Sequence, residues 1–452
     1  MLINLPAQVR EVLQKLSDAG FEGYIVGGCV RDSLLGEDPK DFDVCTNALP
    51  EQIKTVFSEY RTVDTGVKHG TVTVLIEKMP IECTTYRLDG KYSDGRHPDS
   101  VFFTDSLSED LARRDFTVNA MAFNPKDGLI DLFGGQKDLF ARVLRCVGDA
   151  DTRFEEDGLR IMRALRFLSV LDFVPDNFTA AAIFRKTELL RAISKERIAK
   201  ELILLVCGRN ASAVLERYSD VFSEIIPEIK PMVGFEQHSK YHIYDVWKHT
   251  AVAVGASKPD KNVRLALLFH DIGKPSCFRQ DATGAGHFSG HEEVGAEMTD
   301  KILRRLKMDN QTISTVNLLV RNHYITPVAD RTSVKKLLSE IGYQNWKLLA
   351  EVLHGDNMAK RSMCFERIPI IEQMKSIADD IIESRECYTV GMLHIDGTKI
   401  SELGATGRDI RRILNSLLTD VINDVIPNTS TALLQRAKEI YRNIRLGSVY
   451  YG

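Results

Sequence analysis

One stretch, residues 27–43, limits what this chain can fold into because it reads GGCVRDSLLGEDPKDFD. A short apolar run at 24–26 leads into its two glycines, and a helical pattern follows them at once. This order predicts a short strand, a glycine turn, a helix over 29–35 and a second strand over 41–46. Such an alternation is typical of the start of a mixed α/β sheet.

The two aspartates at the end of this stretch indicate a metal site. In a strand, residues two apart point to the same face, so we expect Asp41 and Asp43 to project their carboxylates together. Neighbouring carboxylates repel each other unless a cation lies between them, and Mg²⁺ usually takes one or two carboxylates plus phosphate oxygens. A glycine before a helix, here Gly28, gives phosphate a close approach to backbone N–H groups. With Arg31 nearby, the stretch indicates phosphoryl or nucleotidyl transfer, although each motif alone is common on protein surfaces.

Composition narrows the class of protein. Hydrophobic residues make up 44% and charged residues 27% of the chain, as in ordinary globular proteins. No run of about 18 apolar residues occurs, so we expect no transmembrane helix and no membrane partner. Eight cysteines without a Cys-x-x-Cys pair, and an N-terminus without a signal-peptide layout, fit a reducing cytoplasm. The net charge of −4 argues against massive non-specific binding of nucleic acid but allows a local basic track.

The organisation of the chain changes near Gly135. Before this residue, strand and helix patterns alternate, whereas helical periodicity dominates after it. We therefore predict an α/β head over residues 1–138, followed by helical parts over 139–235, 236–386 and 387–452.

A second motif, RRDFTVNAMA at 113–122, suits a nucleotide. Guanidinium forks match phosphate oxygens, so we expect Arg114 to bind phosphate, and Asp115 with Asn119 could hydrogen-bond a ribose hydroxyl. The alternative is a helix start capped by Asp115 with solvated arginines. Glu82 lies in an earlier strand pattern and is either a third carboxylate near the metal or the partner of a basic residue.

A third motif, EEDGLR at 155–160, places a carboxylate and a guanidinium three residues apart. On a helix, Asp157 and Arg160 would share a face, and a surface salt bridge is the ordinary interpretation. The alternative is that the acceptor and the donor together match the Watson–Crick edge of a base. Arg163 and Arg166 then continue the same face as a phosphate track.

These motifs in combination carry a family resemblance. The chain resembles the class II tRNA nucleotidyltransferases and bacterial poly(A) polymerases of the polymerase β superfamily over its first half. The matching segments are GGCVRDSLLG at 27–36 with Asp41-Phe42-Asp43, RRDFTVNAMA at 113–122, DLFGGQKDL at 131–139, EEDGLRIMRALRF at 155–167 and SKERIAKEL at 194–202. The resemblance implies a head with a polymerase β-type mixed sheet, followed by an all-α neck, body and tail.

The resemblance also implies roles for single residues. It implies that Asp41 and Asp43 are catalytic and bind two Mg²⁺ ions, and that Asp157 with Arg160 pairs with CTP or ATP as a protein template. The residues that it places against the incoming nucleotide are Gly28, Arg31, Arg114, Arg163 and Arg166. The loop at 91–98 resembles the flexible loop associated with adding the terminal A, which disfavours a CC-only enzyme.

A histidine-rich region at 238–358 forms a second group of candidates. Lone histidines are usually core or surface residues, but here they occur with carboxylates at the ends of apolar runs. The spacing resembles an HD-type metal-dependent phosphohydrolase, and the residues that match it are His249, His270, Asp271, His291, His323 and Asp356. Imidazole and carboxylate suit a divalent transition metal or Mg²⁺. Such a domain would hydrolyse phosphoester or cyclic phosphate bonds, and the alternative is a relict helical domain that only supports tRNA.

The sequence therefore predicts a cytoplasmic tRNA nucleotidyltransferase that builds the 3′-CCA end from CTP and ATP, depends on Mg²⁺ and releases pyrophosphate. An A-adding enzyme or a poly(A) polymerase is the nearest alternative, because the motifs are shared. Two other classes are an HD phosphohydrolase whose inert head only binds nucleotide, and a non-catalytic RNA-binding module. In the tail, arginines at 408–412 after a Gly-Ala-Thr-Gly segment predict either an RNA phosphate contact or a solvated helix start.

Overall fold

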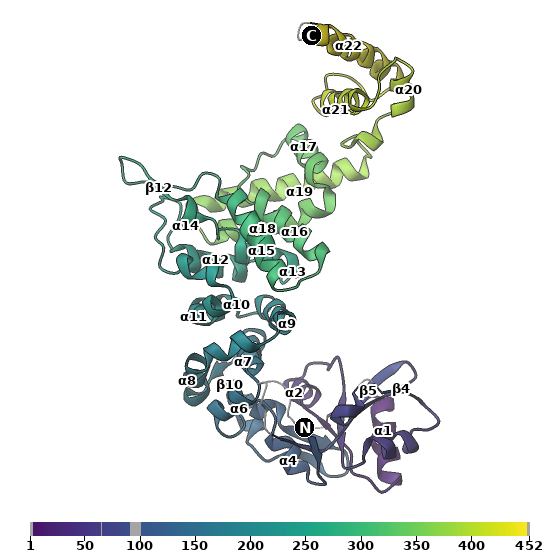
Figure 1. The fold of residues 1–452 in the computed structure, drawn as a ribbon, viewed down its shortest axis with the longest axis vertical. Helices are drawn as coiled ribbons and strands as arrows, with labels where there is room; N and C mark the ends of the chain where they lie inside the picture. Colours follow the sequence, from purple (N-terminus) through teal and green to yellow (C-terminus); the bar gives the residue numbers. More distant parts are fainter. Residues whose placement is uncertain (1–2, 65, 91–100, 450–452) are drawn as a thin grey trace. The chain divides into compact units, whose positions relative to one another are not determined.

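The computed structural model describes residues 3–64, 66–90 and 101–449. The chain divides into two compact units (Figure 1), the first formed by Met1–Lys230 with Arg305–Met308 and the second by Pro231–Arg304 with Asp309–Gly452. This division is coarser than the predicted four parts, whose boundaries stay a prediction. The loop expected at 91–98 lies outside the described residues.

The head in the first unit is built on a seven-stranded sheet with the order β3-β4-β5-β2-β1-β8-β9. Its strands are β1 (Tyr24–Val26), β2 (Asp43–Thr46), β3 (Arg61–Val63), β4 (Thr71–Ile76), β5 (Met79–Thr85), β8 (Met121–Asn124) and β9 (Gly128–Asp131). Neighbouring strands are antiparallel, except that β2 and β5 run parallel and pair Asp43 with Glu82. The predicted mixed α/β head is confirmed.

Burial explains why these segments form strands. All three residues of β1 are buried, and β4 alternates so that Val72, Val74 and Ile76 face the core. A separate antiparallel pair consists of β6 (Arg87–Asp89) and β7 (Val101–Phe103). The helices of the head are α1 (Ala7–Asp18), α2 (Gly28–Leu35), α3 (Pro50–Val56), α4 (Leu107–Ala112) and α5 (Gly135–Phe140).

The second strand begins two residues later than its sequence pattern predicts. β2 starts at Asp43, so Asp41 precedes the strand and does not share a strand face with Asp43. The reason lies in the neighbouring strand, because β1 ends at Val26 opposite Asp43 and Gly27 then turns away with φ 78°. Residues before Asp43 therefore have no ladder partner on β1.

Helices follow the head in the first unit, as the periodicity predicts. They are α6 (Ala150–Glu156), α7 (Leu159–Leu171), α8 (Asn177–Arg185), α9 (Lys195–Val206), α10 (Ala211–Arg217) and α11 (Ser219–Ile225). α7 packs against α9, and a short parallel pair joins β10 (Val143–Leu144) to β11 (Val174–Pro175). Only Asp157 and Gly158 separate α6 from α7, so these two residues form a joint between the helices.

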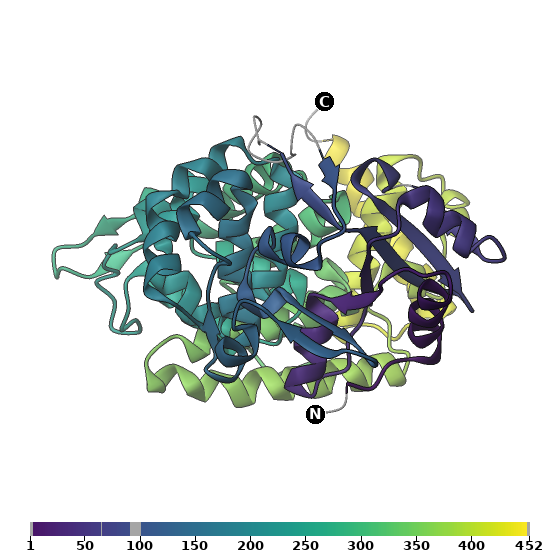
Figure 2. The same cartoon turned by 90° about the horizontal axis from the view of Figure 1, so that it is seen from below.

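The second unit is helical. Its first helices are α12 (Val246–Ala256), α13 (Lys261–Phe269), α14 (Lys274–Cys277), α15 (His291–Arg305), α16 (Asn310–Asn322), α17 (Arg331–Ile341), α18 (Tyr343–Met358) and α19 (Arg367–Glu383). α13 is buried from Val263 to Phe269, and α12, α16 and α18 pack around it. A hairpin of β12 (Arg279–Gln280) and β13 (Gly286–His287) projects from these helices in both views (Figure 1 and Figure 2).

The tail consists of α20 (Gly397–Ser401), α21 (Arg408–Ile422) and α22 (Ser430–Val449). Among the described residues, the hydrophobic cluster that joins these helices has its buried members between Cys387 and Ala437. α21 begins directly after Gly407, as the tail motif predicts. Within the described ranges, no helix has both the length and the apolar character that crossing a membrane requires.

Candidate functional site

A cleft in the first unit brings together all the residues predicted for nucleotide transfer. Its volume is about 910 Å³. The predicted residues that line it are Gly28, Arg31, Asp41, Asp43, Arg114, Asp115, Asn119, Asp157, Arg160, Arg163 and Arg166. They come from α2, the start of β2, the segment after α4, the α6–α7 joint and α7. Segments that are far apart in the sequence therefore form one continuous site.

Three carboxylates lie together on the head. Asp43 begins β2 beside Glu82 of β5, and Asp41 lies two residues earlier. Burial within the cleft and the charge of Glu82 raise the pKa of Asp43, Arg114 opposes them, and Asp41 adds a smaller increase. A divalent cation would relieve this repulsion, and carboxylate oxygens are ligands that Mg²⁺ accepts. The donor set fits a hard divalent metal, and the position of Glu82 favours the third carboxylate over a partner for a basic residue.

The glycine turn shapes the wall of the cleft beside these acids. Gly27 has φ 78°, and a Cβ atom there would lie 3.3 Å from Nη1 of Arg114. A side chain at this position would therefore be strained and would crowd the guanidinium. α2 begins at Gly28, and among the described residues no side chain caps its N-terminus. Its first N–H groups are therefore available to an anion.

Buried carboxylates hold the arginines of the cleft. Asp110, on α4, lies 2.6 Å from Nη2 of Arg113 and 3.1 Å from Nη2 of Arg114. Glu201, on α9, lies 3.2 Å from Nη1 of Arg166. Since each carboxylate is buried and each arginine side chain is at most one-fifth exposed, these pairs are screened less than surface pairs. The guanidinium groups are thus fixed in place before any ligand binds.

Asp115 and Asn119 continue this network. Oδ2 of Asp115 accepts hydrogen bonds from Nε and Nη2 of Arg163 at 2.8 and 2.6 Å. Oδ1 of Asp115 accepts one from Nδ2 of Asn119 at 3.1 Å, and Oδ1 of Asn119 accepts one from Nη1 of Arg31 at 2.6 Å. Both side chains therefore orient arginines, and their contact with a ribose hydroxyl stays a prediction.

Replacing Asp115 with asparagine is expected to destabilise the protein by roughly 2 kcal/mol near neutral pH. Burial alone would raise the pKa of Asp115, but the charges of Arg163 and Arg160 outweigh it, and the pKa falls to about 2. Since the unfolded value is about 3.9, the stabilisation is complete above that pH and is lost as pH falls toward the folded pKa. The urea midpoints of the wild type and of Asp115→Asn, determined at about pH 7 and at about pH 3, measure the stability that ionised Asp115 contributes.

The difference between the urea midpoints of the wild type and Asp115→Asn should be smaller at about pH 3 than at about pH 7. Asp64→Asn is the matched control, because it removes a carboxylate of the head that is 58% exposed, and it is expected to move the midpoint little. A gap of the same size at both pH values would contradict an ionic origin.

Asp157 and Arg160 lie at the α6–α7 joint. Asp157 lies between α6 and α7 and not on the face of α7, and its Oδ1 accepts a hydrogen bond from the N–H of Leu159, the first residue of α7, at 3.0 Å. Arg160 donates to Oε2 of Glu156 at 2.6 Å and to two backbone carbonyls. Asp157 pairs with Arg197 of α9 at 2.7 Å. In the described part of the chain, the recorded ion pairs join Asp157 to Arg197 and Arg160 to Glu156, and not to each other as the ordinary interpretation predicted.

Sequence reasoning gave no role to Asp110, Arg197 and Glu201, which hold the site together. Asp110 could have been found from its spacing, since it lies three and four residues before two arginines at the C-terminal end of α4. Arg197 and Glu201 both belong to SKERIAKEL, a segment that carried the resemblance without a role. The sequence could not show that Arg197 pairs with Asp157 and Glu201 with Arg166, because α9 packs against α7 only in the folded protein.

The predicted metal ligands of the second unit meet in one buried place. They are His249, His270, Asp271, His291, His323 and Asp356. Two groups could each hold a metal ion, namely His249 with His270 and Asp271, and Asp271 with His291 and His323. Within each group the ligand atoms lie within 4.8 Å of one another, and Asp271 belongs to both groups. Asp356 joins the first group, with Oδ1 3.1 Å from Nε2 of His249. These histidines are therefore not separate core residues.

Each imidazole of this group is oriented by the backbone. The distances from Nδ1 to a carbonyl oxygen are 3.2 Å for His249, 2.7 Å for His270, 2.8 Å for His291 and 2.6 Å for His323. A hydrogen bond at Nδ1 leaves Nε2 free to face the centre, which is the usual arrangement of metal-ligating histidines. The local structure therefore fits a divalent transition metal.

Charge suits metal binding at two of these imidazoles, whereas the neighbouring carboxylates favour the charged form of a third. Burial lowers the pKa of His249, and it lowers that of His291 to about 4, so both imidazoles are neutral near pH 7, as ligands must be. Burial would lower the pKa of His270 too, but Asp271 and Asp356 raise it to about 9. Burial would raise the pKa of Asp271, but the charges of His270 and Lys274 keep it well below its usual range.

Two lysines that sequence reasoning did not single out contact the metal-type group. Nζ of Lys274 lies 2.7 Å from Asp271, and Nζ of Lys360 lies 2.5 Å from Asp356. The position of Lys274, directly after the His-Asp-Ile-Gly segment, could have indicated it. His287 lies apart from this group, exposed on β13 and paired with Asp281.

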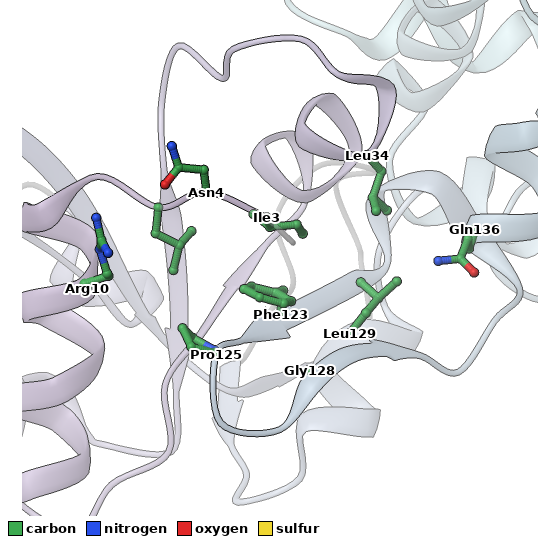
Figure 3. Close-up of a pocket in the computed structure, with 10 residues that line it drawn as sticks. Ile3, Asn4, Arg10, Leu34, Phe123, Pro125, Gly128, Leu129 and Gln136 are labelled. Atoms are coloured by element: carbon green, nitrogen blue, oxygen red, sulfur yellow. The ribbon is translucent and has the colours of Figure 1, made fainter. Parts of the chain in front are cut away.

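A separate pocket of about 760 Å³ on the head is mainly apolar (Figure 3). Ile3, Leu34, Phe123 and Leu129 line it, and Arg10 supplies charge. The predicted nucleotide-transfer residues line the larger cleft, and none of them lines this pocket.

Family models match three parts of the chain. The Poly A polymerase head domain matches residues 23–145, the probable RNA and SrmB-binding site of polymerase A matches 172–232, and the HD domain matches 240–351. The first range contains the acid group, and the last contains five of the six metal-type ligands.

Relatives of known name match more of the chain. The CCA-adding enzyme of Limosilactobacillus reuteri is 48% identical over 437 residues, which cover 95% of this chain and 96% of that relative. The CCA-adding enzyme of Lactobacillus delbrueckii subsp. bulgaricus is 50% identical over 204 residues, so this match spans about half of each chain. The crystal structure of the Bacillus stearothermophilus CCA-adding enzyme in complex with CTP matches with a TM-score of 0.71 at 26% identity, covering 97% of this chain and 98% of that one. Since the first match extends over nearly all of both sequences, this chain belongs to the CCA-adding enzyme family.

Proposed function

We propose that this chain is a template-independent tRNA nucleotidyltransferase that adds CCA to the 3′ end of tRNA from CTP and ATP. The observation that carries the proposal is one cleft in which Asp41 and Asp43 lie with Asp157 and Arg160. The first pair suits a metal, and the second suits the edge of a base. Similarity to an enzyme crystallised with CTP supports CTP as a substrate. A chain that acts on tRNA and has eight free cysteines fits the cytoplasm.

Asp41 and Asp43, with Glu82 beside them, would hold Mg²⁺ in this cleft. Bound there, Mg²⁺ would ease ionisation of the RNA 3′-hydroxyl and offset the charge of the departing pyrophosphate. Burial and Glu82 raise the pKa of Asp43, and the charge of Arg114 opposes this rise and so favours the ionised form that a ligand requires. The acid group therefore binds and orients, and it forms no covalent bond to the substrate.

The triphosphate would lie against the start of α2 at Gly28 and against four guanidinium groups, those of Arg31, Arg114, Arg163 and Arg166. The 3′-oxygen of the RNA attacks the α-phosphorus in line, and the bond from that phosphorus to the pyrophosphate oxygen breaks. The hydroxyl proton passes to solvent water, and pyrophosphate leaves with the electron pair. Since carboxylates already fix the arginines, little reorganisation is needed as charge develops.

Asp157 and Arg160 would read the base. Cytosine and adenine each present an exocyclic amino donor next to a ring nitrogen acceptor, which match a carboxylate acceptor and a guanidinium donor. Uracil and guanine present the opposite order at these positions. The two side chains therefore accept CTP and ATP and reject UTP and GTP without a nucleic-acid template.

Asp157→Ala and Arg160→Ala are each expected to reduce nucleotide selectivity more than they reduce the rate of transfer. Loss of one charged hydrogen-bonding partner should reduce the preference for CTP over UTP by about tenfold or more. Single-turnover incorporation with each of the four nucleoside triphosphates measures the preference. Glu155→Ala is the control, since its side chain is exposed and pairs with Lys186. Unchanged selection in both site variants would overturn the role in base reading.

The substrate is tested with three RNAs, namely tRNA that lacks CCA, tRNA that lacks only the terminal A, and an unrelated RNA. Extension of the first by C, C and A in order is the expected result. Extension of only the second would identify an A-adding enzyme, and long A tails on the third would identify a poly(A) polymerase. In the four-part division, the helical tail at 387–452 would contribute to tRNA binding.

A second activity is favoured by the buried group of six ligands in the second unit. We propose that it holds a divalent transition metal and hydrolyses phosphoester or cyclic phosphate bonds. The backbone-oriented imidazoles and the shared Asp271 support this. With the metal bound, water would be activated for attack on phosphorus. Lys274 and Lys360 would add positive charge beside the carboxylates that they contact.

A further inference from the structure

One aromatic ring in the cleft lies against three of the arginines that are proposed to bind the triphosphate. Phe167, on α7, is 5% exposed and lines the cleft. The distance from the guanidinium carbon Cζ to the centre of this ring is 4.2 Å for Arg166, 5.1 Å for Arg31 and 5.6 Å for Arg163. A cation within about 6 Å of an aromatic centroid is attracted by the negative face of the ring. Phe167 therefore makes a cation–π contact with each of the three guanidinium groups.

We infer that Phe167 is a positioning residue for the triphosphate, because its ring holds Arg31, Arg163 and Arg166 together at the wall of the cleft without adding negative charge. This inference rests on the proposed binding of the triphosphate by these arginines. It adds a side chain that has neither charge nor a hydrogen-bonding group. Phe167 acts through the arginines and takes no part in the making or breaking of bonds.

The three guanidinium groups need a neutral partner because they repel one another. Burial lowers the pKa of Arg166, Glu201 opposes this change, and the charges of Arg163 and Arg31 lower the pKa further. The side chain of Arg166 is only 16% exposed, so water and salt screen this repulsion weakly. An aromatic face attracts each of the cations and leaves the net charge of the site unchanged. The ring thus keeps the three arginines close to one another before a triphosphate binds.

A further carboxylate would serve this purpose less well than a ring. Each of the three arginines already has one carboxylate partner, namely Asp32 for Arg31, Asp115 for Arg163 and Glu201 for Arg166. Another carboxylate would occupy more N–H donors, and its charge would repel the triphosphate. A cation–π contact adds no acceptor oxygen and no negative charge, so more of the N–H donors stay available to phosphate oxygens.

The ring is itself held in place by the core. Phe116, which is fully buried, packs against Phe167 edge to face, with the ring centres 5.7 Å apart and the planes at 82°. Arg163 lies one helical turn before Phe167 on α7, whereas Arg31 comes from α2 of the head. A fixed ring therefore joins arginines from two separate helices into one surface for the triphosphate.

The test replaces Phe167 with mono-, di- and trifluorinated phenylalanine, which weaken the negative face of the ring step by step with little change in its shape. The KM for CTP and for ATP is expected to rise with each fluorine, by about tenfold for the trifluorinated ring, whereas kcat changes little. The affinity for inorganic tripolyphosphate, measured by calorimetry without RNA, should fall in parallel. The preference for CTP over UTP should stay at the wild-type value, because Asp157 and Arg160 are retained.

The same fluorinated series at Phe57 is the matched control. Phe57 is fully buried in the head and does not line the cleft, so its fluorination should leave the KM values and the affinity for tripolyphosphate unchanged. Phe167→Leu keeps an apolar side chain and removes the ring, so it should weaken tripolyphosphate binding at least as much as trifluorination does. Urea midpoints of all variants show whether each one is folded during the assay.

Arg166→Ala separates this inference from the proposed function. If Arg166→Ala weakens tripolyphosphate binding and the fluorinated rings at Phe167 do not, the triphosphate site stands and the role of Phe167 fails. If Arg166→Ala binds tripolyphosphate as the wild type does, the proposed triphosphate site fails, and this inference fails with it. Equal rises in KM for the series at Phe167 and at Phe57 would show that fluorine disturbs packing, and would also overturn the inference. A fall in kcat at unchanged KM would contradict a role in positioning the triphosphate.

Discussion

Asp43→Asn is expected to lower nucleotide transfer by at least about a thousandfold. Asparagine keeps the shape of the side chain and its place at the start of β2, but it removes the negative charge that a divalent cation requires. Asp43 pairs with Glu82 across the strands, and its pKa responds to the charges of Glu82, Arg114 and Asp41. The measurement is incorporation of labelled CMP or AMP into tRNA at saturating nucleotide.

The fold of this variant should be intact, because the carboxylate of Asp43 is exposed to the cleft and its strand partners pair through the backbone. Asp64→Asn, which removes an exposed carboxylate elsewhere on the head, should transfer nucleotide at the wild-type rate. Transfer by Asp43→Asn within a few-fold of wild type would show that the acid group is not the catalytic metal site. Nucleotide binding without transfer would show that the triphosphate arginines act independently of it.

The second large effect is expected for a substitution of a metal-type ligand in the second unit. His270→Ala should weaken metal binding by at least about a hundredfold and abolish any phosphohydrolase activity. Its Nε2 lies 3.2 Å from Oδ2 of Asp271 and 3.6 Å from Oδ1 of Asp356, so its removal opens the centre of the first ligand group. The metal content of the purified protein and the hydrolysis of a 2′,3′-cyclic nucleotide measure the two consequences.

His287→Ala is the matched control, because this imidazole is exposed on β13, outside the ligand group. Its metal content and hydrolysis should equal those of the wild type. If wild type co-purifies with no metal and His270→Ala behaves in the same way, the second unit is a relict helical domain that supports RNA. If metal is present but no cyclic phosphate is cleaved, the metal is structural.

Much of this arrangement is predictable from short-range sequence features. The glycine turn before α2, the acid pair and the histidine spacing each follow from local rules. The glycine turn and the acid pair line the cleft, and the histidines meet in the buried group of the second unit. The start of β2 was misplaced, because strand length depends on how far the partner β1 extends before Gly27 turns. Asp157 was also misplaced, because its backbone is extended between α6 and α7 where the pattern predicts a continuous helix.

The sequence did not show which acidic and basic side chains form ion pairs. Arg166 meets Glu201, and Asp157 meets Arg197, only because α7 and α9 pack together. Two arginines of one motif, Arg113 and Arg114, share Asp110, and local spacing would have been enough to show it. Ion pairs between residues far apart in the sequence therefore cannot be predicted from local patterns, whereas ion pairs between residues three or four apart can.

The separate hydrophobic cluster of the tail has a consequence for dynamics. Among the described residues, its fully buried members, such as Ile400, Ile413, Leu417 and Leu433, come from α20, α21 and α22. A set of helices that packs mainly on itself can open and close as one cooperative step, with its own rate of amide hydrogen exchange. The tail can thus open through local unfolding while the metal-type centre keeps its geometry.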